Sequence, residues 1–145
     1  MKPTPKGWPR LSSAVFYKDG GKAIDWLCEA FGFEVRLKVE GEGGRIEHSE
    51  LVYGEAVIMV GDEQVQADKG RNLRSPASVG GVNTQAATFY VDDVDAHYAR
   101  AKKAGAAITY EPQTTDYGED HWADRSYQAR DPEGHLWWFC ERVRG

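Results

Sequence analysis

Two stretches decide the fold, because they match when they are aligned without gaps: residues 14–38, AVFYKDGGKAIDWLCEAFGFEVRLK, and residues 87–111, ATFYVDDVDAHYARAKKAGAAITYE. The separation is 73 residues for each of the matched pairs Phe16/Phe89, Tyr17/Tyr90 and Gly32/Gly105. Further on, Gly54 corresponds to Gly134, which is 80 residues away, so the second half holds seven extra residues (80 − 73 = 7). Self-similarity at this period indicates a tandem duplication of one supersecondary unit.

Each half is predicted to fold as a strand, a helix and three further strands. Residues 12–18 alternate and are rich in Val, Phe and Tyr, as in a strand. Residues 22–31 carry a helical stripe of apolar side chains that ends at Gly32, and Asp92 is expected to cap the second helix. The sequence therefore predicts an α+β fold of two tandem βαβββ modules, at residues 11–63 and 84–143, joined by a linker at 64–83.

The alternation of side chains along a strand assigns the residues to faces. In residues 45–53 the helix side should take Ser49, Leu51 and Tyr53, which leaves His48 and Glu50 on the other side with Val52. In residues 33–39 the core should take Val35, Leu37 and Val39, which leaves Arg36 and Lys38 pointing away. In the second half, Gln128 corresponds to His48 and Arg130 to Glu50, so a mixed polar lining is expected on both helix-free faces.

Two long polar segments interrupt the repeat, at residues 62–83 and 112–125. Segments of this length are usually disordered linkers or binding lids. For the first segment both interpretations stay open. The second holds Tyr117, His121 and Trp122 among acidic residues, and it is predicted to be a lid over the binding site.

Composition excludes several classes of protein. The net charge of −5 and the scattered Lys and Arg residues argue against nucleic acid, and favour a neutral or cationic small-molecule partner. No run of about 18 apolar residues is present, and residues 1–10 lack the apolar segment of a secretory signal, so no membrane association and a cytoplasmic location are expected. Cys28 and Cys140 lack metal-ligand spacing and should be buried thiols.

The duplicated pattern, YVDDVDAHYARAKKAGA at 90–106 and ARDPEGHLWWF at 129–139 resemble the vicinal oxygen chelate superfamily, and in particular its bacterial glyoxalase-like proteins. That superfamily includes glyoxalase I, extradiol dioxygenases and bleomycin resistance proteins. The resemblance covers about residues 11–143. It implies that a helix covers one face of each sheet while the other faces form a cleft, and that the protein is a homodimer.

The resemblance also implies four metal-ligand positions, on the first and last strand of each module. Counted from the FYKD and FYVD anchors and from the GEA and EGH turns, these positions hold Ser13, Ala86, Ile58 and Trp138. Ala, Ile and Trp cannot bind a divalent ion, and Ser alone is a poor ligand, so no metal and no other cofactor is expected there. Tyr17 and Tyr90 should share the side of Ser13 and Ala86. Trp138 would line the cleft as a stacking surface and Trp137 would pack under a helix.

Two functions follow as hypotheses. The first is a metal-free cleft that binds an aromatic or cationic small molecule, with the ligand contacted by Trp138, Trp122, Tyr17, Tyr90, Arg36, Gln128, Arg130, Tyr117 and His121. The alternative is an enzyme of the isomerase, lyase or dioxygenase type, which uses His48 and Glu50 as an acid–base pair or a metal site elsewhere. Binding is favoured because no preorganised source of charge stabilisation is visible in the sequence.

Overall fold

The computed structural model describes residues 1–145 and consists of two four-stranded mixed sheets and three helices. Sheet A has the order β1-β4-β3-β2 and contains β1 (Ser13–Tyr17), β2 (Glu34–Glu40), β3 (Ile46–Tyr53) and β4 (Ala56–Asp62). Sheet B has the order β5-β8-β7-β6 and contains β5 (Ala87–Tyr90), β6 (Ala107–Asp116), β7 (Ala123–Arg130) and β8 (Leu136–Arg144). In each sheet the first and last strands pair in parallel, and the other neighbours are antiparallel. The predicted α+β fold of two βαβββ modules is confirmed.

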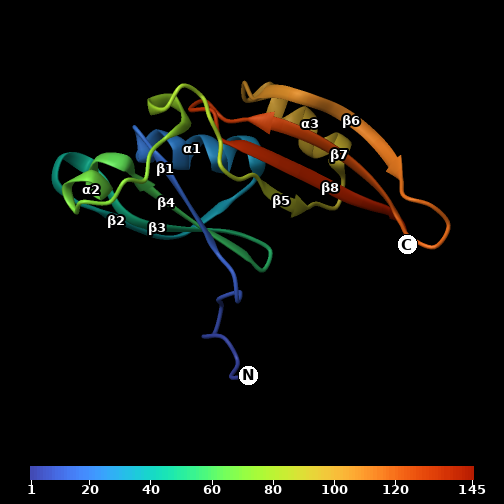
Figure 1. Ribbon diagram of the computed structural model, residues 1–145, viewed down its shortest axis with the longest axis horizontal. Coiled ribbons are helices and arrows are strands. Elements are labelled where there is room, and N and C mark those ends of the chain that lie inside the picture. Colours follow the sequence, from blue (N-terminus) through green and yellow to red (C-terminus); the bar gives the residue numbers. More distant parts are fainter.

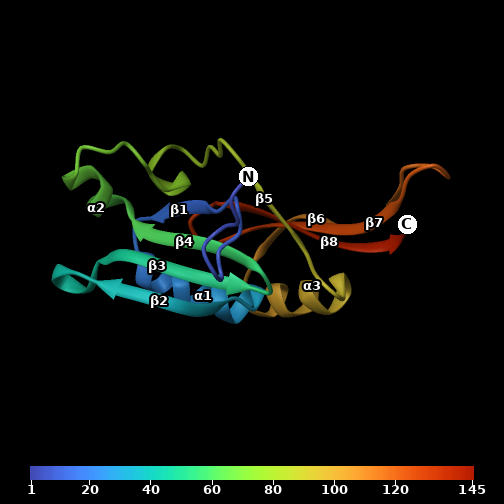
Figure 2. The same cartoon turned by 90° about the horizontal axis from the view of Figure 1, so that it is seen from below.

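The helices α1 (Gly20–Phe31) and α3 (Val94–Lys103) lie next to each other on the same side of the two sheets (Figures 1 and 2). Helix α1 begins where the Asp19 side chain accepts a hydrogen bond from the Lys22 backbone N–H at 3.1 Å. It ends at Gly32, which adopts the left-handed conformation (φ 82°) that glycine reaches without strain. Both ends of this helix are therefore fixed by local chemistry.

In the structure, corresponding residues of the two modules are separated by one residue more or less than the sequence comparison indicates. Helix α3 is capped by Asp93 rather than by Asp92, and 93 − 19 gives 74. In the sheets, Ser13 pairs with Ile58 and Ala87 pairs with Trp137, which gives 74 for the first strands (87 − 13) and 79 for the last (137 − 58). A slip of one residue sends a side chain to the opposite face of a sheet. Residues that were matched by separations of 73 or 80 therefore point to opposite faces of their sheets in the two modules.

One hydrophobic core runs through both modules, between the sheets and the helices. Trp137 is 1% exposed, and its ring lies 5.7 to 6.0 Å from those of Phe31, Phe33 and Phe89. The prediction that Trp137 packs under a helix is confirmed. Because aromatic rings from both modules meet there, neither module buries its core alone.

Asp131, in the turn between β7 and β8, joins the modules through a carboxylate with four donors. One oxygen accepts from the Tyr17 hydroxyl at 2.6 Å and from Trp137 Nε1 at 3.0 Å. The other accepts from the backbone N–H groups of Glu133 and His135 at 3.1 and 3.0 Å. Burial is the main cause that raises the pKa of Tyr17 well above its usual value, with Asp131 adding to it. Tyr17 therefore lies in the core, 1% exposed, whereas Tyr90 is 54% exposed, so the prediction that the two tyrosines share one cleft face is wrong.

Strand β2 departs from simple alternation because its register with β3 shifts between Val35 and Leu37. Leu37 consequently pairs with Glu50 and shares its face, while Lys38 pairs with Ser49 on the helix side. The predicted core positions on this edge strand are wrong, since Val35, Leu37 and Val39 are 45%, 42% and 43% exposed.

The segment predicted as a lid is a β-hairpin. Strand β6 runs to Asp116 and β7 begins at Ala123, so only the tip between them is a turn. Pro112 lies on the edge strand at a break in register, where its missing N–H costs no ladder bond. The other long segment folds into a short helix, α2 (Glu63–Asp68), and a single 3₁₀ turn, η2 (Pro76–Ser78). No helix has the length and hydropathy needed to cross a membrane.

Candidate functional site

Each sheet has one face without a helix, here called the open face. On sheet A it carries Ala14, Met59 and Glu50, which are paired across β1, β4 and β3. Both open faces look toward the same side of the molecule, opposite α1 and α3, as Figure 2 shows. Within one chain the open faces therefore lie beside each other and do not close over a common cleft.

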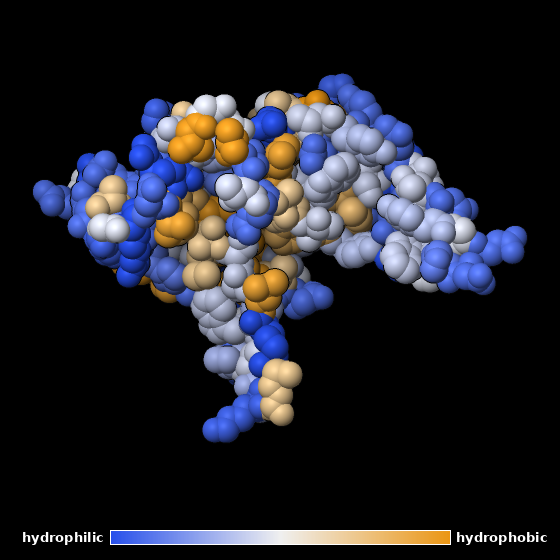
Figure 3. Space-filling model, in the orientation of Figure 1, coloured by the Kyte–Doolittle hydropathy of each residue, from blue (hydrophilic) through white to orange (hydrophobic).

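A groove of about 790 Å³ runs between the two sheets, here called the seam groove. Its lining comes from the edges of both sheets, including Ala14 and Phe16 of β1, Val57 of β4, Thr88 of β5 and Leu136 of β8. The connection between the modules adds Leu73, Pro76, Val79 and Val82. In Figure 3 apolar atoms gather in this region between the modules. The volume lies within the range of about 300–1,000 Å³ that is usual for small-molecule sites.

An aromatic row crosses the open face of sheet B next to the groove. Thr88, Trp138, Gln128 and Tyr110 are paired in turn across β5, β8, β7 and β6, so their side chains share one face. The rings of Trp138 and Tyr110 lie 5.2 Å apart in an edge-on arrangement. Thr88 also lines the seam groove, so the row of Thr88, Trp138, Gln128 and Tyr110 continues the groove as a half-buried aromatic surface.

The predicted acid–base pair forms on the open face of sheet A. His48 Nε2 lies 2.9 Å from Glu50 Oε2, and Arg36 Nε donates to the other carboxylate oxygen at 3.0 Å. The bond from His48, and then the Arg36 guanidinium, lower the pKa of Glu50 from its usual value. Arg36 also donates to the Gly7 carbonyl oxygen at 2.6 Å and lies over the Trp8 ring at 4.6 Å. The N-terminal segment thus holds Arg36 against Glu50.

The four inferred metal positions do not share one face. Ser13 pairs with Ile58 on the helix side of sheet A, where Ile58 is 3% exposed, and both residues also line the seam groove. Ala86 is exposed in the seam groove and Trp138 lies on the open face. The separations inferred from the sequence, 73 and 80, each differ by one residue from the observed 74 and 79. This difference placed Ser13 and Ile58 on the face opposite to the one that the comparison with Ala86 and Trp138 requires.

With the observed separations, the counterparts of Ala86 and Trp138 are Ser12 (86 − 74) and Met59 (138 − 79). Ser12 Oγ is buried without a hydrogen-bond partner. One hydroxyl, one thioether, one methyl group and one indole do not fit a divalent cation. No three His, Cys, Asp or Glu side chains in the chain are grouped in a way that could hold a metal ion. The donor set that the resemblance implies is therefore missing from these positions.

The predicted ligand residues of the hairpin lie far along the sheet from the seam groove. Tyr117, His121 and Trp122 form the tip between β6 and β7, with Tyr117 and Trp122 53% and 42% exposed. The Arg142 guanidinium lies between the rings of Trp122 and Tyr90, at 4.9 and 5.3 Å. The structure brings these residues together, but away from the groove.

A cation of the chain itself already occupies this aromatic pair. Arg142 Nε donates to Asp124 at 2.5 Å and Arg142 Nη2 donates to the Tyr90 hydroxyl at 2.6 Å, while that hydroxyl donates to Asp124 at 2.9 Å. The bond to Asp124 is the main cause that raises the pKa of Arg142. An external cation would have to displace Arg142 to reach the rings of Tyr90 and Trp122.

Arg130 and Gln128 both lie near the seam groove on the open face of sheet B. Arg130 donates to the carbonyl oxygens of Gly134 and Gly81, at 3.2 and 3.4 Å, and so ties the β7–β8 turn to the connection between the modules. Gln128 accepts from the Thr109 hydroxyl at 2.7 Å. Sequence reasoning missed Tyr110, because a register shift in β6 precedes it, and missed Leu73, Val79 and Val82, because they lie in a segment without periodicity.

Two tandem βαβββ modules, with helices on one side and a groove between helix-free faces on the other, define a protein of the glyoxalase type. The chain belongs to the Glyoxalase/Bleomycin resistance protein/Dioxygenase superfamily, whose family model matches residues 11–139.

Relatives with similar sequence extend over nearly the whole chain. The uncharacterized protein Mb0911c of Mycobacterium bovis is 32% identical over 136 residues, which cover 94% of this chain and 85% of that protein. Rv0887c of Mycobacterium tuberculosis is also 32% identical, covering 94% of this chain and 76% of that protein.

Solved structures show the same fold. TioX from Micromonospora sp. ML1 is 32% identical with a TM-score of 0.66, covering 92% of this chain and 95% of that one. A glyoxalase/bleomycin resistance protein/dioxygenase family enzyme from Burkholderia phytofirmans PsJN, 18% identical with a TM-score of 0.65, covers 91% of this chain and 97% of that one. This second likeness extends to the fold alone.

Proposed function

We propose that the protein binds a planar aromatic small molecule in the seam groove, with Trp138 as a stacking surface, and that this binding needs no metal ion. The observation that carries the proposal is an apolar groove of about 790 Å³ that continues into the row of Thr88, Trp138, Gln128 and Tyr110. Apolar pockets with a few convergent polar groups are the usual form of a small-molecule site. An aromatic contact adds about 0.5–1.5 kcal/mol beyond the burial of area.

The charges favour a neutral ligand over a cation. Of the acidic side chains on the open faces, Glu50 is paired with Arg36, and Asp124 with Arg142. Next to the aromatic row, the guanidinium of Arg130 binds only the backbone carbonyl oxygens of Gly134 and Gly81, so it adds a positive charge that no carboxylate offsets. The aromatic part of the sequence-based hypothesis is therefore kept, and its cationic part is the weaker one.

A matched pair of fluorescent probes tests both points. Anthracenemethanol is neutral, its aminomethyl analogue is cationic, and both should quench tryptophan emission by energy transfer when bound. The neutral probe is expected to quench saturably at one site per chain, with the cation weaker. Trp138→Ala should weaken the neutral probe by about 2- to 12-fold, the equivalent of one aromatic contact. Trp122→Ala, at the hairpin tip, is the control and should leave the affinity unchanged.

The result against the proposal is quenching that never saturates, or an equal affinity in Trp138→Ala and the wild-type protein. Tighter binding of the cationic probe than of the neutral one would instead favour a cationic ligand. Treatment with a chelator should not alter the affinity for the neutral probe. Loss of binding on chelation would contradict a metal-free site.

We also propose that two copies of the chain assemble through their open faces. The support is that both open faces look the same way, and that Leu37 and Val39 are 42% and 43% exposed on the open face of sheet A. A second copy would cover these apolar side chains and enclose the aromatic row. Sedimentation equilibrium is expected to give the mass of a dimer, and Leu37→Lys the mass of a monomer. A monomeric wild-type protein would refute the proposal.

The alternative function, acid–base catalysis, has one observation in its favour, the 2.9 Å contact between His48 and Glu50. Because Nε2 faces the carboxylate, Nδ1 is left to accept a proton from a substrate. Glu50 would act as the positioning residue, since its lowered pKa keeps it ionised. The test is a screen for turnover of dicarbonyl and thiohemiacetal compounds, in which any activity must be lost in His48→Gln. Activity that survives this substitution would exclude the role.

A further inference from the structure

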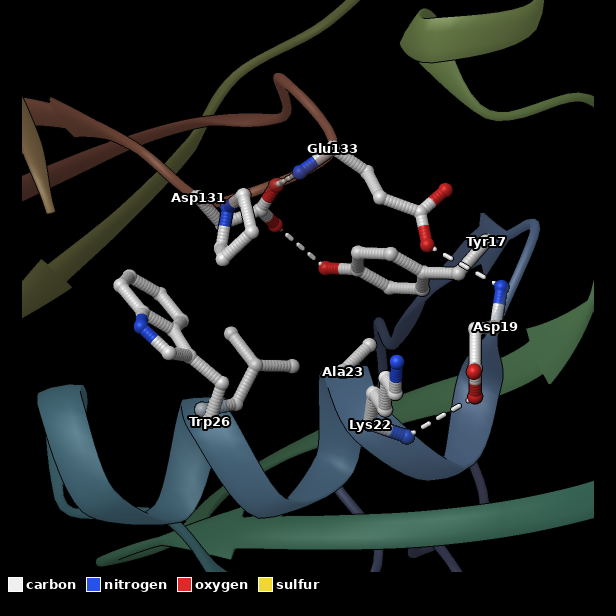
Figure 4. A pocket seen from close by; sticks show the side chains of 9 residues that line it. Tyr17, Asp19, Lys22, Ala23, Trp26, Asp131 and Glu133 are labelled. Atoms are coloured by element: carbon white, nitrogen blue, oxygen red, sulfur yellow. Dashed lines mark hydrogen bonds between the residues drawn. The ribbon is translucent and has the colours of Figure 1, made fainter. Parts of the chain in front are cut away.

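A second, smaller cavity lies on the opposite side of the β7–β8 turn from the seam groove. It has a volume of about 300 Å³, and Figure 4 shows α1 forming one wall and the turn with Asp131 and Glu133 the other. Ala23, Trp26 and Leu27 of α1 and Pro132 of the turn give it an apolar interior. The space matches a single aromatic ring with a short substituent.

The bottom of this cavity is built from buried, fully partnered groups. Tyr17 is 1% exposed and Asp131 is 5% exposed, and their 2.6 Å hydrogen bond closes the cavity on the side of the core. The Trp26 ring is held in place because its Nε1 donates to the Ala104 carbonyl oxygen at 2.8 Å. The cavity is therefore a space between the modules whose base and Trp26 wall are fixed by hydrogen bonds.

Charge at the rim decides which ligand this space suits. The lining contains three carboxylates, those of Asp19, Asp131 and Glu133, and one ammonium group, that of Lys22. The carboxylates already accept hydrogen bonds from the chain: Asp19 from the Lys22 N–H, and Glu133 from the N–H groups of Lys18 and Asp19 at 2.7 and 3.1 Å. They would act on a ligand through their field more than through direct bonds. Trp26 adds an indole wall of the kind that attracts cations.

We propose that this cavity is a second ligand site, and that it takes a small arylammonium or alkylammonium ion whose apolar part packs on Trp26 and Leu27. The site is separate from the seam groove in position and in ligand charge. The turn of residues 131–136 lies between the two, contributing Asp131 and Glu133 to the small cavity and Leu136 to the groove. A ligand here would contact both modules at once.

The experiment is an NMR titration of the full-length protein with benzylamine, followed through the indole Nε1–H signal of Trp26, which Trp26→Phe identifies. Benzyl alcohol and benzoate serve as neutral and anionic probes of the same size. The expected result is a saturable shift of the Trp26 signal, with benzylamine bound more tightly than benzyl alcohol and benzoate bound weakest. Trp138→Ala should leave this titration unchanged, so the failure of one site is distinguishable from failure of the other.

Two substitutions at the rim distinguish recognition of the ligand's charge from nonspecific apolar binding. Lys22→Gln removes the one opposing cation and should tighten benzylamine by about threefold. Asp19→Asn preserves the helix cap, because Asn caps as well as Asp, and should weaken benzylamine by about threefold. Equal affinities in both variants and the wild-type protein, equal shifts with benzoate, or a shift that does not saturate would each overturn the proposal.

Discussion

Replacement of Asp131 by Asn should destabilise the docking of the two modules while leaving the size of the side chain unchanged. The carboxylate oxygen that accepts from the Tyr17 hydroxyl and from Trp137 Nε1 would become an amino group, if the amide oxygen stays with the turn N–H groups of Glu133 and His135. The Tyr17 hydroxyl can rotate to accept from that amino group. The Trp137 N–H is a donor only and would be left without a partner.

The magnitude follows from burial. Trp137 is 1% exposed, so its stranded N–H costs about 1–3 kcal/mol, and the loss of a charged acceptor for the Tyr17 hydroxyl adds about 1 kcal/mol. The expected loss of unfolding free energy is thus about 2–4 kcal/mol, a large share of the 5–15 kcal/mol that is typical of folded proteins. Urea denaturation measures it as a lower midpoint with an unchanged slope.

Tyr17→Phe is the matched control. It removes one donor and leaves the carboxylate with three, so it should cost about 1 kcal/mol. A loss below about 0.5 kcal/mol in Asp131→Asn, the size usual for substitutions away from the core, would refute the role of Asp131. So would a larger loss in Tyr17→Phe than in Asp131→Asn.

Two further predictions concern stability. Burial lowers the pKa of His97, which bonds the Tyr127 hydroxyl at 2.5 Å and the Phe31 carbonyl oxygen at 2.8 Å, so the folded state binds this proton less readily than the unfolded state does. The unfolding free energy should therefore fall as the pH drops below about 6.5. In His97→Gln the urea midpoint should change less between pH 7.5 and 5.5 than it does in the wild-type protein, and an equal change in both proteins would contradict this. A methyl group at Gly20 would lie 3.1 Å from Ile46 Cγ1 and 3.4 Å from Asp62 Cγ, so Gly20→Ala should cost about 1–3 kcal/mol in the same assay, against no loss at Gly21, where the nearest atom is 3.7 Å away.

The fold could be predicted from the sequence because its signals are local. The Asp19 cap, the Gly32 stop and the alternation of β3 each depend on neighbouring residues, and the structure places Ser49 and Leu51 inside, as that alternation predicts. The repeat itself was visible because Phe and Tyr recur in both first strands. These features need no knowledge of how the modules meet.

The errors arose where a single residue changes the register. The second module enters its helix one residue later, at Asp93, so matching Phe16 with Phe89 turned Ser13 and Tyr17 to the wrong face. In β2 a bulge did the same for Leu37. No alternation pattern reports a bulge, because the extra residue is ordinary in type.

The seam groove could not be predicted because it depends on the relation between modules. Its walls come from β1, β4, β5 and β8 and from the connection at residues 72–86, which are distant in sequence. The Asp131 contacts that fix this relation span 114 residues to Tyr17. Sequence periodicity assigns a residue to a face of its own element, and it leaves open which element the face meets.

The most direct test of the account is calorimetric titration of chelator-treated protein with anthracenemethanol, comparing Ala86→Arg with Ala99→Arg. Ala86 is exposed in the seam groove, whereas Ala99 is exposed on α3, on the opposite side of the molecule. The account predicts one site per chain in the wild-type protein and in Ala99→Arg, and loss of that site in Ala86→Arg. Equal binding by both variants, or binding that returns only when a metal ion is added, would contradict it.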